Sequence, residues 1–347
     1  MPDLRSPRRS GAHPGGVALC RRAGIGAIAI VLAATACGDD GPLRGTEVDV
    51  RVPRGAGMST IARELERAGL IDHPRLFALY VRVKGAERDL KAGHYRFAAG
   101  TSWGGLVDAL RGGDVVTHPL TIPEGLPIRE VADRIAGFTR GSPDSVRTLL
   151  ADSALARELG VPGPTLEGYL FPETYRFAED VGVRTIVATM VERYRGFWGA
   201  RERALADSLG LDEGQVVTLA SIVEEEARLS EERPMIAGVY LNRLERGMLL
   251  QADPTVQYAL GEPKERLLYR DIDRVADDPY NTYTNPGLPP GPIASPGEAS
   301  LRAVLEPARH EFLFFVAEPD GSHVFTRTER EHINAKNRIR RERGWSP

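Results

Sequence analysis

The sequence predicts an α+β protein, in which a small β-α-α-β-α module precedes a larger mixed α/β domain. The first observation is length: 347 residues with 42% hydrophobic content suffice for about two domains with their own cores. The second is a series of short strand-like runs that alternate with segments of helical spacing. The third is a change to Pro-, Gly- and Asn-rich sequence after Gly247, which predicts long ordered loops.

The composition argues against several kinds of site. The chain carries 45 basic and 48 acidic residues, a formal net charge of -3, so nothing in its charge favours nucleic acid as a partner. Its two cysteines, Cys20 and Cys37, both precede Gly38, which leaves the rest of the chain without a thiol for disulfides, zinc or nucleophilic catalysis. Its seven histidines are scattered without metal-ligand spacing. We therefore expect no metal and no cofactor.

The N-terminus has the pattern of a targeting segment. A basic region, 1–22, expected in the cytoplasm, precedes an apolar run that ends at Cys37 and is followed by a polar linker, 38–46. As a helix the run reaches only about 21 Å, short of the ~30 Å hydrocarbon core, which favours a secretory segment. The ending resembles a lipoprotein signal with Cys37 as the lipidated residue, although Ala34 stands where a larger aliphatic residue is usual. An uncleaved single-span anchor over 23–37 is the alternative, and either anchor places the body outside the plasma (inner) membrane, on the periplasmic side.

The first module follows the linker. Alternation over 48–52 predicts a strand, and helical spacing from Ile61 to Leu70 and over 77–83 predicts two helices. A second strand over 93–97 and a helix through Leu110 complete the module. Residues 47–118 therefore form a unit that resembles the LysM domains that bind N-acetylglucosamine polymers. The alternative is that this unit only braces the next domain.

The larger region, 119–342, continues without an obvious linker and is followed by a short tail, 343–347. Helical spacing predicts helices near residues 128–136, 145–159, 183–199, 236–244 and 296–305, and a solvated helix face from Lys336. A strand from Phe312 to Val316 returns through Asp320-Gly321 into a second strand. The Pro/Gly/Asn-rich segments 251–256, 280–283 and 287–293 are predicted to be ordered loops without regular structure.

The stretch from Leu219 to Ala227 places three consecutive carboxylates in an apolar helical run. At 100° per residue, one apolar stripe consists of Val216, Leu219, Ala220, Val223 and Ala227, widened by Ile222. Glu225 then points to water, whereas Glu224 and Glu226 lie on the two flanks of the stripe, where burial moves a glutamate pKa from ~4.3 toward ~6 to 7. Such an acid suits proton transfer near neutral pH. In the alternative, these residues are solvated or pair with Arg228 and Arg233.

Six motifs occur in one order: LEGYLFPETY (166–175), ASIVEEEA (220–227), LNRL (241–244), QADPTVQY (251–258), YNTY (280–283) and GLPPGPIASPG (287–297). Together they resemble the endolytic murein (peptidoglycan) transglycosylases, the YceG-like family, over nearly the whole exported chain. The resemblance implies a membrane-anchored protein with a LysM-like module and a catalytic domain over 119–342. It also implies that nascent peptidoglycan glycan strands are the substrate and that peptidoglycan synthases are candidate partners. The departures are Pro292 and Ser295, and the near-lipobox at Cys37.

The resemblance assigns catalysis to Glu224. A lytic enzyme needs one carboxylate, because the C6 hydroxyl of the substrate's N-acetylmuramic acid is the nucleophile: Glu224 protonates the leaving oxygen and then accepts the hydroxyl proton. The bond between N-acetylmuramic acid and N-acetylglucosamine is cleaved without water, and the resulting 1,6-anhydro end terminates strand elongation. Candidate substrate-binding residues are Tyr169, Tyr175, Glu226, Asn242, Gln251, Asp253, Tyr280, Asn281 and Tyr283. The tyrosines could instead be core residues, and Asp253 a turn residue.

Two rival functions remain open at this point. One is a peptidoglycan hydrolase in which Asp253 or Glu226 is a second carboxylate. The other is a non-catalytic protein that binds cell-wall glycan. Glu167 and Glu173 are expected to be structural, with arginines such as Arg176 or Arg243 as partners. The turn residue Glu124 is expected to have no further role.

Overall fold

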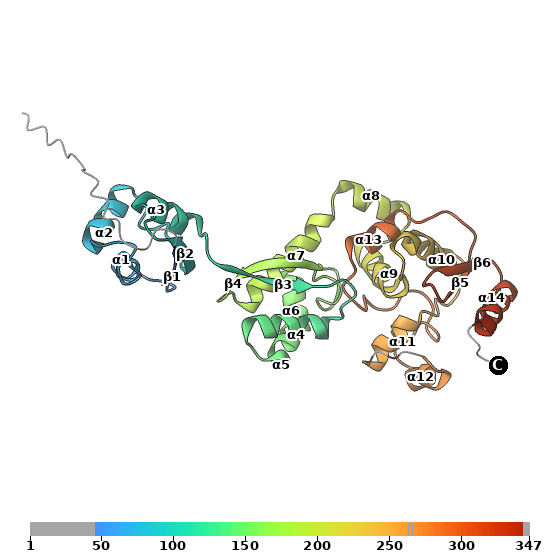
Figure 1. Ribbon diagram of the computed structural model, residues 1–347. Helices are drawn as coiled ribbons and strands as arrows, with labels where there is room; N and C mark the ends of the chain where they lie inside the picture. Colours follow the sequence, from blue (N-terminus) through green and yellow to red (C-terminus); the bar gives the residue numbers. More distant parts are fainter. Residues whose placement is uncertain (1–45, 263, 265–266, 343–347) are drawn as a thin grey trace, which may run out of the picture. The chain divides into compact units, whose positions relative to one another are not determined.

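The computed structural model describes residues 46–262, 264 and 267–342, and Figure 1 shows their helices and strands. The predicted basic region, anchor and tail lie outside the described residues, so lipidation at Cys37 stays a prediction. Within the described ranges, no helix combines the length and the apolar character needed to cross a membrane.

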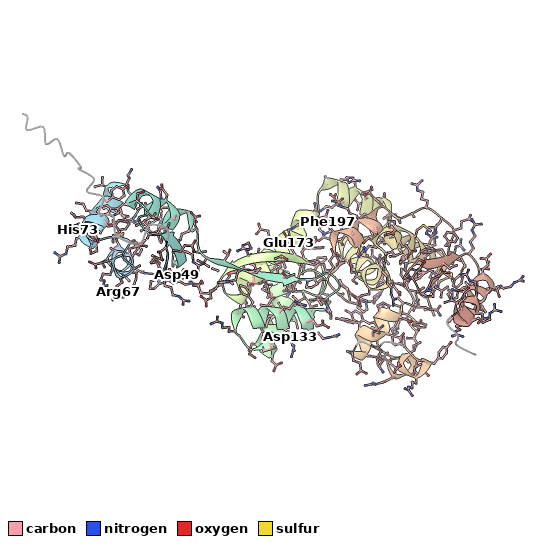
Figure 2. All side chains as sticks on the ribbon, viewed as in Figure 1. Asp49, Arg67, His73, Asp133, Glu173 and Phe197 are labelled. Carbon is pink, nitrogen blue, oxygen red and sulfur yellow. The ribbon has the colours of Figure 1, made fainter. Side chains whose placement is uncertain are left out.

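The N-terminal module has the predicted β-α-α-β-α order. It consists of β1 (Glu47–Val52), α1 (Met58–Arg67), α2 (Pro74–Val83), β2 (Gly93–Ala98) and α3 (Trp103–Gly112). Strands β1 and β2 pair antiparallel with Val50 opposite Tyr95, and both side chains are buried in a core that belongs to this module alone. On the outer face Asp49, labelled in Figure 2, accepts a 2.9 Å hydrogen bond from Nε of Arg96 across the ladder.

The larger domain mixes helices with two-stranded antiparallel sheets, which confirms the α+β class. Its elements are β3 (Thr117–Ile122), α4 (Ile128–Thr139), α5 (Pro143–Leu150), α6 (Ser153–Glu158), β4 (Glu173–Ala178), α7 (Val183–Phe197), α8 (Ala200–Ser208), α9 (Glu213–Glu226), the 3₁₀ turn η1 (Ser230–Glu232), α10 (Arg233–Glu245), α11 (Asp253–Leu260), α12 (Tyr269–Arg274), α13 (Glu298–Leu305), β5 (Phe314–Ala317), β6 (His323–Thr326) and α14 (Glu329–Glu342). Strand β3 pairs with β4, and β5 pairs with β6 as predicted.

Helix α9 lies at the centre of this domain and packs against α8, α10, α11 and α13 (Figure 1). It begins with a capping box, in which the Asp212 carboxylate accepts the Gln215 backbone N–H at 2.8 Å and the Gln215 side chain accepts the Asp212 N–H at 2.9 Å. Every residue from Val216 to Val223 is buried. The predicted single apolar stripe is therefore wrong in extent, because neighbouring helices cover all sides of α9. Its buried hydroxyls avoid a desolvation cost by donating to main-chain carbonyls within the helix.

Two predicted elements differ from the structure. The helix predicted over 145–159 is split into α5 and α6, because the Asp152 side chain accepts the Ala154 N–H at 2.8 Å and starts a new helix. The loop predicted over 251–256 contains the start of α11 instead. Asp253 and Pro254 occupy the first turn of α11, where the missing N–H of proline costs no hydrogen bond.

Candidate active site

The carboxylate of Glu224 is held at the C-terminal end of α9 and has a side-chain exposure of 6%. Its Oε1 accepts a 2.9 Å hydrogen bond from Nη2 of Arg233, and its Oε2 accepts a 2.9 Å bond from the backbone N–H of Gly297. Gly297 is the N-cap of α13, so this N–H belongs to the helix end at which the macrodipole favours negative charge. Both donors therefore stabilise an anion at this position.

Arg233 is itself fixed from two sides. It is buried, with Nε donating to the Ser300 hydroxyl at 2.9 Å and Nη1 donating to the Ser230 hydroxyl at 2.6 Å. These bonds tie the guanidinium to α13 and to η1. The ion pair between Glu224 and Arg233 that the sequence left as an alternative is thus present, and it orients the carboxylate that the family resemblance assigns to catalysis.

The turn between β3 and α4 brings Glu124 to the same place. The backbone N–H of Gly125 donates to the Ser295 carbonyl at 2.9 Å, and the Ser295 N–H donates to the Leu126 carbonyl at 2.9 Å. A Cβ added at Gly297 would overlap the Glu124 carboxylate, so Glu124 lies against the residue whose N–H binds Glu224. Burial and the charge of Glu224 raise the pKa of Glu124, and Arg233 opposes this shift. Glu124 is exposed, unlike Glu224.

The sequence did not predict that Glu124 lies beside Glu224. One signal was available: three strand-to-helix junctions share a glycine turn, at 52–55, 97–100 and 122–125, and only the third carries a carboxylate directly before its glycine. Nothing in the local pattern indicated that the loop after Gly287 would lie beside it.

Glycine at position 125 allows this turn to approach the end of α9. Its φ of +77° favours glycine, and an added Cβ would lie 2.7 Å from Oε1 of Glu225. Glu225 is exposed, as predicted. Partial desolvation, with the nearby charges of Glu224 and Glu130, raises the pKa of its carboxyl to about 7.

The opposite flank of α9 carries a second polar cluster. Glu226 accepts a 2.9 Å hydrogen bond from the Tyr240 hydroxyl, and burial, followed by the charge of Asp253, raises its pKa to about 7 as the helical pattern predicted. The Tyr283 hydroxyl donates to Asp253 at 2.5 Å. Gln251 is exposed with a φ of 48°, a strained conformation of the kind that concentrates at functional sites. These candidate residues therefore lie near one another, and Glu226 shares no hydrogen-bond partner with Glu224.

The other tyrosine candidates lie in the interior. Tyr169 and Tyr175 are buried; Tyr169 meets the Tyr194 ring edge-on at 5.3 Å, and the Tyr175 hydroxyl donates to the Phe171 carbonyl at 2.6 Å. These placements agree with the core alternative. Tyr280 is partly buried, with its ring centroid 4.8 Å from that of Tyr258.

The two asparagine candidates bind the main chain. Asn281 has an exposed fraction of 0%, and its amide donates to the Ile272 carbonyl at 3.1 Å and the Val275 carbonyl at 3.0 Å. The Asn242 amide donates to the carbonyls of His310 and Phe312 at 2.9 and 3.0 Å. Both amides hold loops in place.

Two of the sequence motifs, 166–175 and 251–258, meet at Glu167. This residue is buried, and both its oxygens accept the N–H of Ile128 at the start of α4, at 2.9 and 3.1 Å. The Tyr258 hydroxyl of α11 donates to Oε2 at 3.1 Å. Burial raises the pKa of Glu167 to about 8 despite these donors. The arginine partners predicted for Glu167 are wrong, because a helix N-terminus and a tyrosine hydroxyl take their place.

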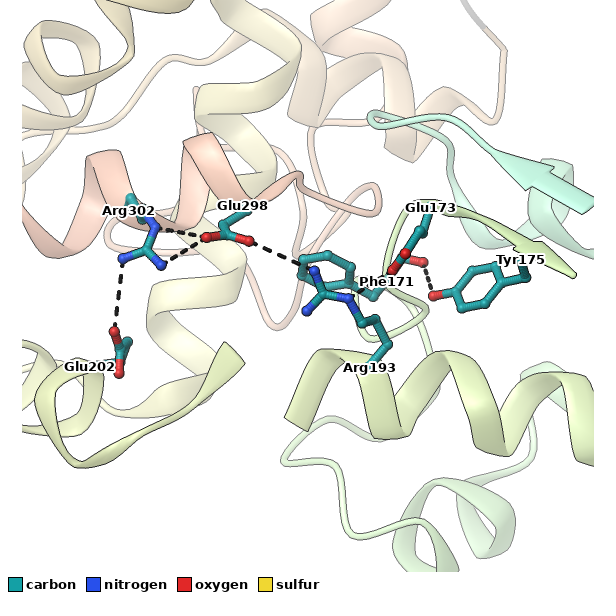
Figure 3. Close-up of polar contacts among 7 residues, drawn as sticks. All are labelled: Phe171, Glu173, Tyr175, Arg193, Glu202, Glu298 and Arg302. Atoms are coloured by element: carbon teal, nitrogen blue, oxygen red, sulfur yellow. Dashed lines mark hydrogen bonds and ion pairs between the residues drawn. The ribbon is translucent and has the colours of Figure 1, made fainter. Parts of the chain in front are cut away.

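The start of α13 is anchored by a series of ion pairs (Figure 3). Glu298, which follows Gly297, accepts bonds of 2.9 and 2.7 Å from Arg302 and lies 3.8 Å from Arg193. Arg193 also binds Glu173 at 2.7 Å, so the predicted partner of that glutamate is an arginine, although not Arg176 or Arg243. Each exposed pair contributes at most about 1 kcal/mol, yet together they connect β4, α7 and α13. This network holds the helix end whose N–H binds Glu224.

Three comparisons connect these features to known proteins. The model of the YceG-like family matches residues 50–338. A Bacillus subtilis (strain 168) protein named endolytic murein transglycosylase is 35% identical over 309 residues, which cover 84% of this chain and 85% of that protein. A Streptococcus pneumoniae serotype 2 protein of the same name is 31% identical over 335 residues, with 83% of this chain and 59% of that protein covered. The 2.6 Å crystal structure of a YceG-like protein from Listeria monocytogenes has a TM-score of 0.58 and 33% identity, and the match covers 83% of this chain and 98% of that one.

Proposed function

Because the chain belongs to the YceG-like family, we propose that it is an endolytic murein transglycosylase, a lyase that cleaves peptidoglycan glycan strands. The observation that carries the proposal is the placement of Glu224. Its carboxylate ends a buried helix and is oriented by Arg233 and by the N–H of Gly297. Fixed geometry of this kind is what acid–base catalysis requires.

The proposed reaction uses the substrate's own hydroxyl. The C6 oxygen of N-acetylmuramic acid attacks C1 as the glycosidic bond to N-acetylglucosamine breaks, and the product carries a 1,6-anhydro end. Glu224 is the catalytic carboxylate, which protonates the leaving oxygen and then accepts the C6 proton. No water is consumed, so the elongating strand ends in a form that has no free reducing end.

We propose that the cluster on the opposite flank of α9 contacts the glycan, through Glu226, Gln251, Asp253 and Tyr283. The strained Gln251 and the exposed Asp253 support this placement.

Residues 47–118 are proposed to be a LysM-like glycan-binding module. Residues 23–37 are proposed to anchor the protein to the plasma membrane, with the catalytic domain on the outer side and near peptidoglycan synthases.

Product masses test the proposed function. The full-length protein in detergent is incubated with purified peptidoglycan, and the released muropeptides are weighed by mass spectrometry. We expect fragments that are lighter by one water than reducing-end products. Reducing-end masses would favour the hydrolase alternative, and the absence of any release would favour the glycan-binding alternative.

A further inference from the structure

A second carboxyl group lies beside Glu224 in the proposed site. Glu124 is placed there by paired main-chain bonds between its turn and Ser295, both of 2.9 Å. The same loop continues to Gly297, which touches the Glu124 carboxylate and donates its N–H to Glu224. Gly297 thus contacts both carboxyl groups.

The surroundings of the two carboxyl groups differ. Glu224 has a guanidinium and a helix N-terminus as direct donors and a side-chain exposure of 6%. Glu124 is exposed. Desolvation, followed by the negative charge of Glu224, raises the pKa of Glu124. When two adjacent groups differ in this way, the less stabilised anion keeps the proton. The anion of Glu124 therefore has weaker support than that of Glu224, which suits Glu124 to donate a proton and Glu224, with its two fixed donors, to accept one.

We propose that Glu124 is a second catalytic residue, the general acid that protonates the leaving glycosidic oxygen while Glu224 accepts the proton of the C6 hydroxyl. This assignment rests on the proposed function and refines the single-carboxylate scheme in which Glu224 performs both steps. In this assignment the exposed side chain of Glu124 contacts the departing sugar.

The proton and bond changes balance. The bond from C1 of N-acetylmuramic acid to O4 of N-acetylglucosamine breaks, and O4 takes the proton of Glu124. The bond from O6 to C1 forms, and the O6 proton passes to Glu224. Glu124 is then ionised and Glu224 protonated, so transfer of one proton between these neighbours restores the starting state without an external reactant.

The geometry of the product favours neighbouring carboxyl groups. The anhydro bridge forms on the face of the sugar ring from which the leaving oxygen departs, so the proton donor and the proton acceptor must lie on that same face. Glu124 and Glu224 are close enough to reach one face together, because both contact Gly297. Glu226 and Asp253 are placed differently, because Glu226 projects from the other flank of α9 and bonds to Tyr240.

The test compares two leaving groups in the full-length protein. One substrate is a glycan strand, whose leaving oxygen needs a proton, and the other is a muramyl glycoside of dinitrophenol, whose phenolate needs none. We expect Glu124→Gln to lower glycan cleavage on the order of 10²-fold and to leave dinitrophenolate release within a few-fold of wild type. Glu224→Gln should impair both reactions, because both need the base. The exposed Glu231→Gln, with the same change of charge, should impair neither.

A second variant displaces Glu124 without removing it. Gly297 has a φ of -75°, which alanine accepts, but the added Cβ overlaps the Glu124 carboxylate and forces it to move. Gly297→Ala should therefore show the same dependence on the leaving group as Glu124→Gln. Equal losses on both substrates, or no loss on glycan, would overturn the role of Glu124. If the wild type forms no anhydro product, the proposed function fails instead.

Discussion

Glu224→Gln is expected to reduce glycan release by at least about 10³-fold while glycan binding persists. The amide cannot accept the C6 proton, and it can offer an acceptor to only one of the two donors, Arg233 and the Gly297 N–H. One buried donor is then left without a partner, which is expected to lower the free energy of unfolding by about 1 to 3 kcal/mol. Release of muropeptides and sedimentation with insoluble peptidoglycan measure the two activities separately.

The control for this prediction is Glu231→Gln, which removes one charge from an exposed site in η1. Its release rate should match that of the wild type. A folded Glu224→Gln protein that releases glycan within about tenfold of the wild-type rate would contradict the assignment of Glu224.

Glu167→Gln is expected to make the protein more resistant to alkaline unfolding. Burial raises the pKa of Glu167 from an ordinary 4.5 to about 8, so between these values the folded state holds a proton that the unfolded state has lost. The stability of the wild type therefore falls as pH rises through this window and levels off above it. This fall in the free energy of unfolding amounts to roughly 5 kcal/mol at most. The glutamine variant does not show it, because its side chain has no carboxyl group to ionise.

Denaturant unfolding at pH 5 and pH 8 measures the effect. The stability of Glu167→Gln relative to wild type should rise between the two pH values, because only the wild type has a carboxyl group at this position whose pKa burial raises. The exposed Glu192→Gln on α7 serves as the matched control and should show no such trend. A constant difference between Glu167→Gln and wild type at both pH values would show that Glu167 is ionised in the folded protein.

Local sequence patterns predicted the elements that periodicity and turn or cap residues specify. The order of strands and helices over residues 47–112, helix α9 and the β5–β6 hairpin all follow from periodicity and glycine or capping signals. The break at Asp152 and the helix at Asp253 were missed because each depends on a single cap or first-turn residue, which spacing does not reveal.

The candidate site could be predicted where its residues lie on one helix. It could not be predicted where residues distant in the sequence come into contact. The family resemblance assigned catalysis to Glu224, and Glu224 and Glu226 were singled out because both lie on α9 within an apolar run. Glu124 was not, because Ser295 and Gly297, which lie against its turn, are far away in the sequence. Asn242 and Asn281 were predicted to bind substrate because they lie in motifs, but their amides bind main-chain carbonyls. A polar residue in a motif can therefore hold a loop in place instead of binding a ligand.

The central claim is that a glycosidic bond is broken at Glu224 by the substrate's own hydroxyl rather than by water. Cleavage of peptidoglycan by the full-length protein in H₂¹⁸O tests this most directly. The account predicts released muramyl ends without ¹⁸O, formed by wild type and lost in Glu224→Gln. Incorporation of one ¹⁸O atom at C1 of each new end would contradict it.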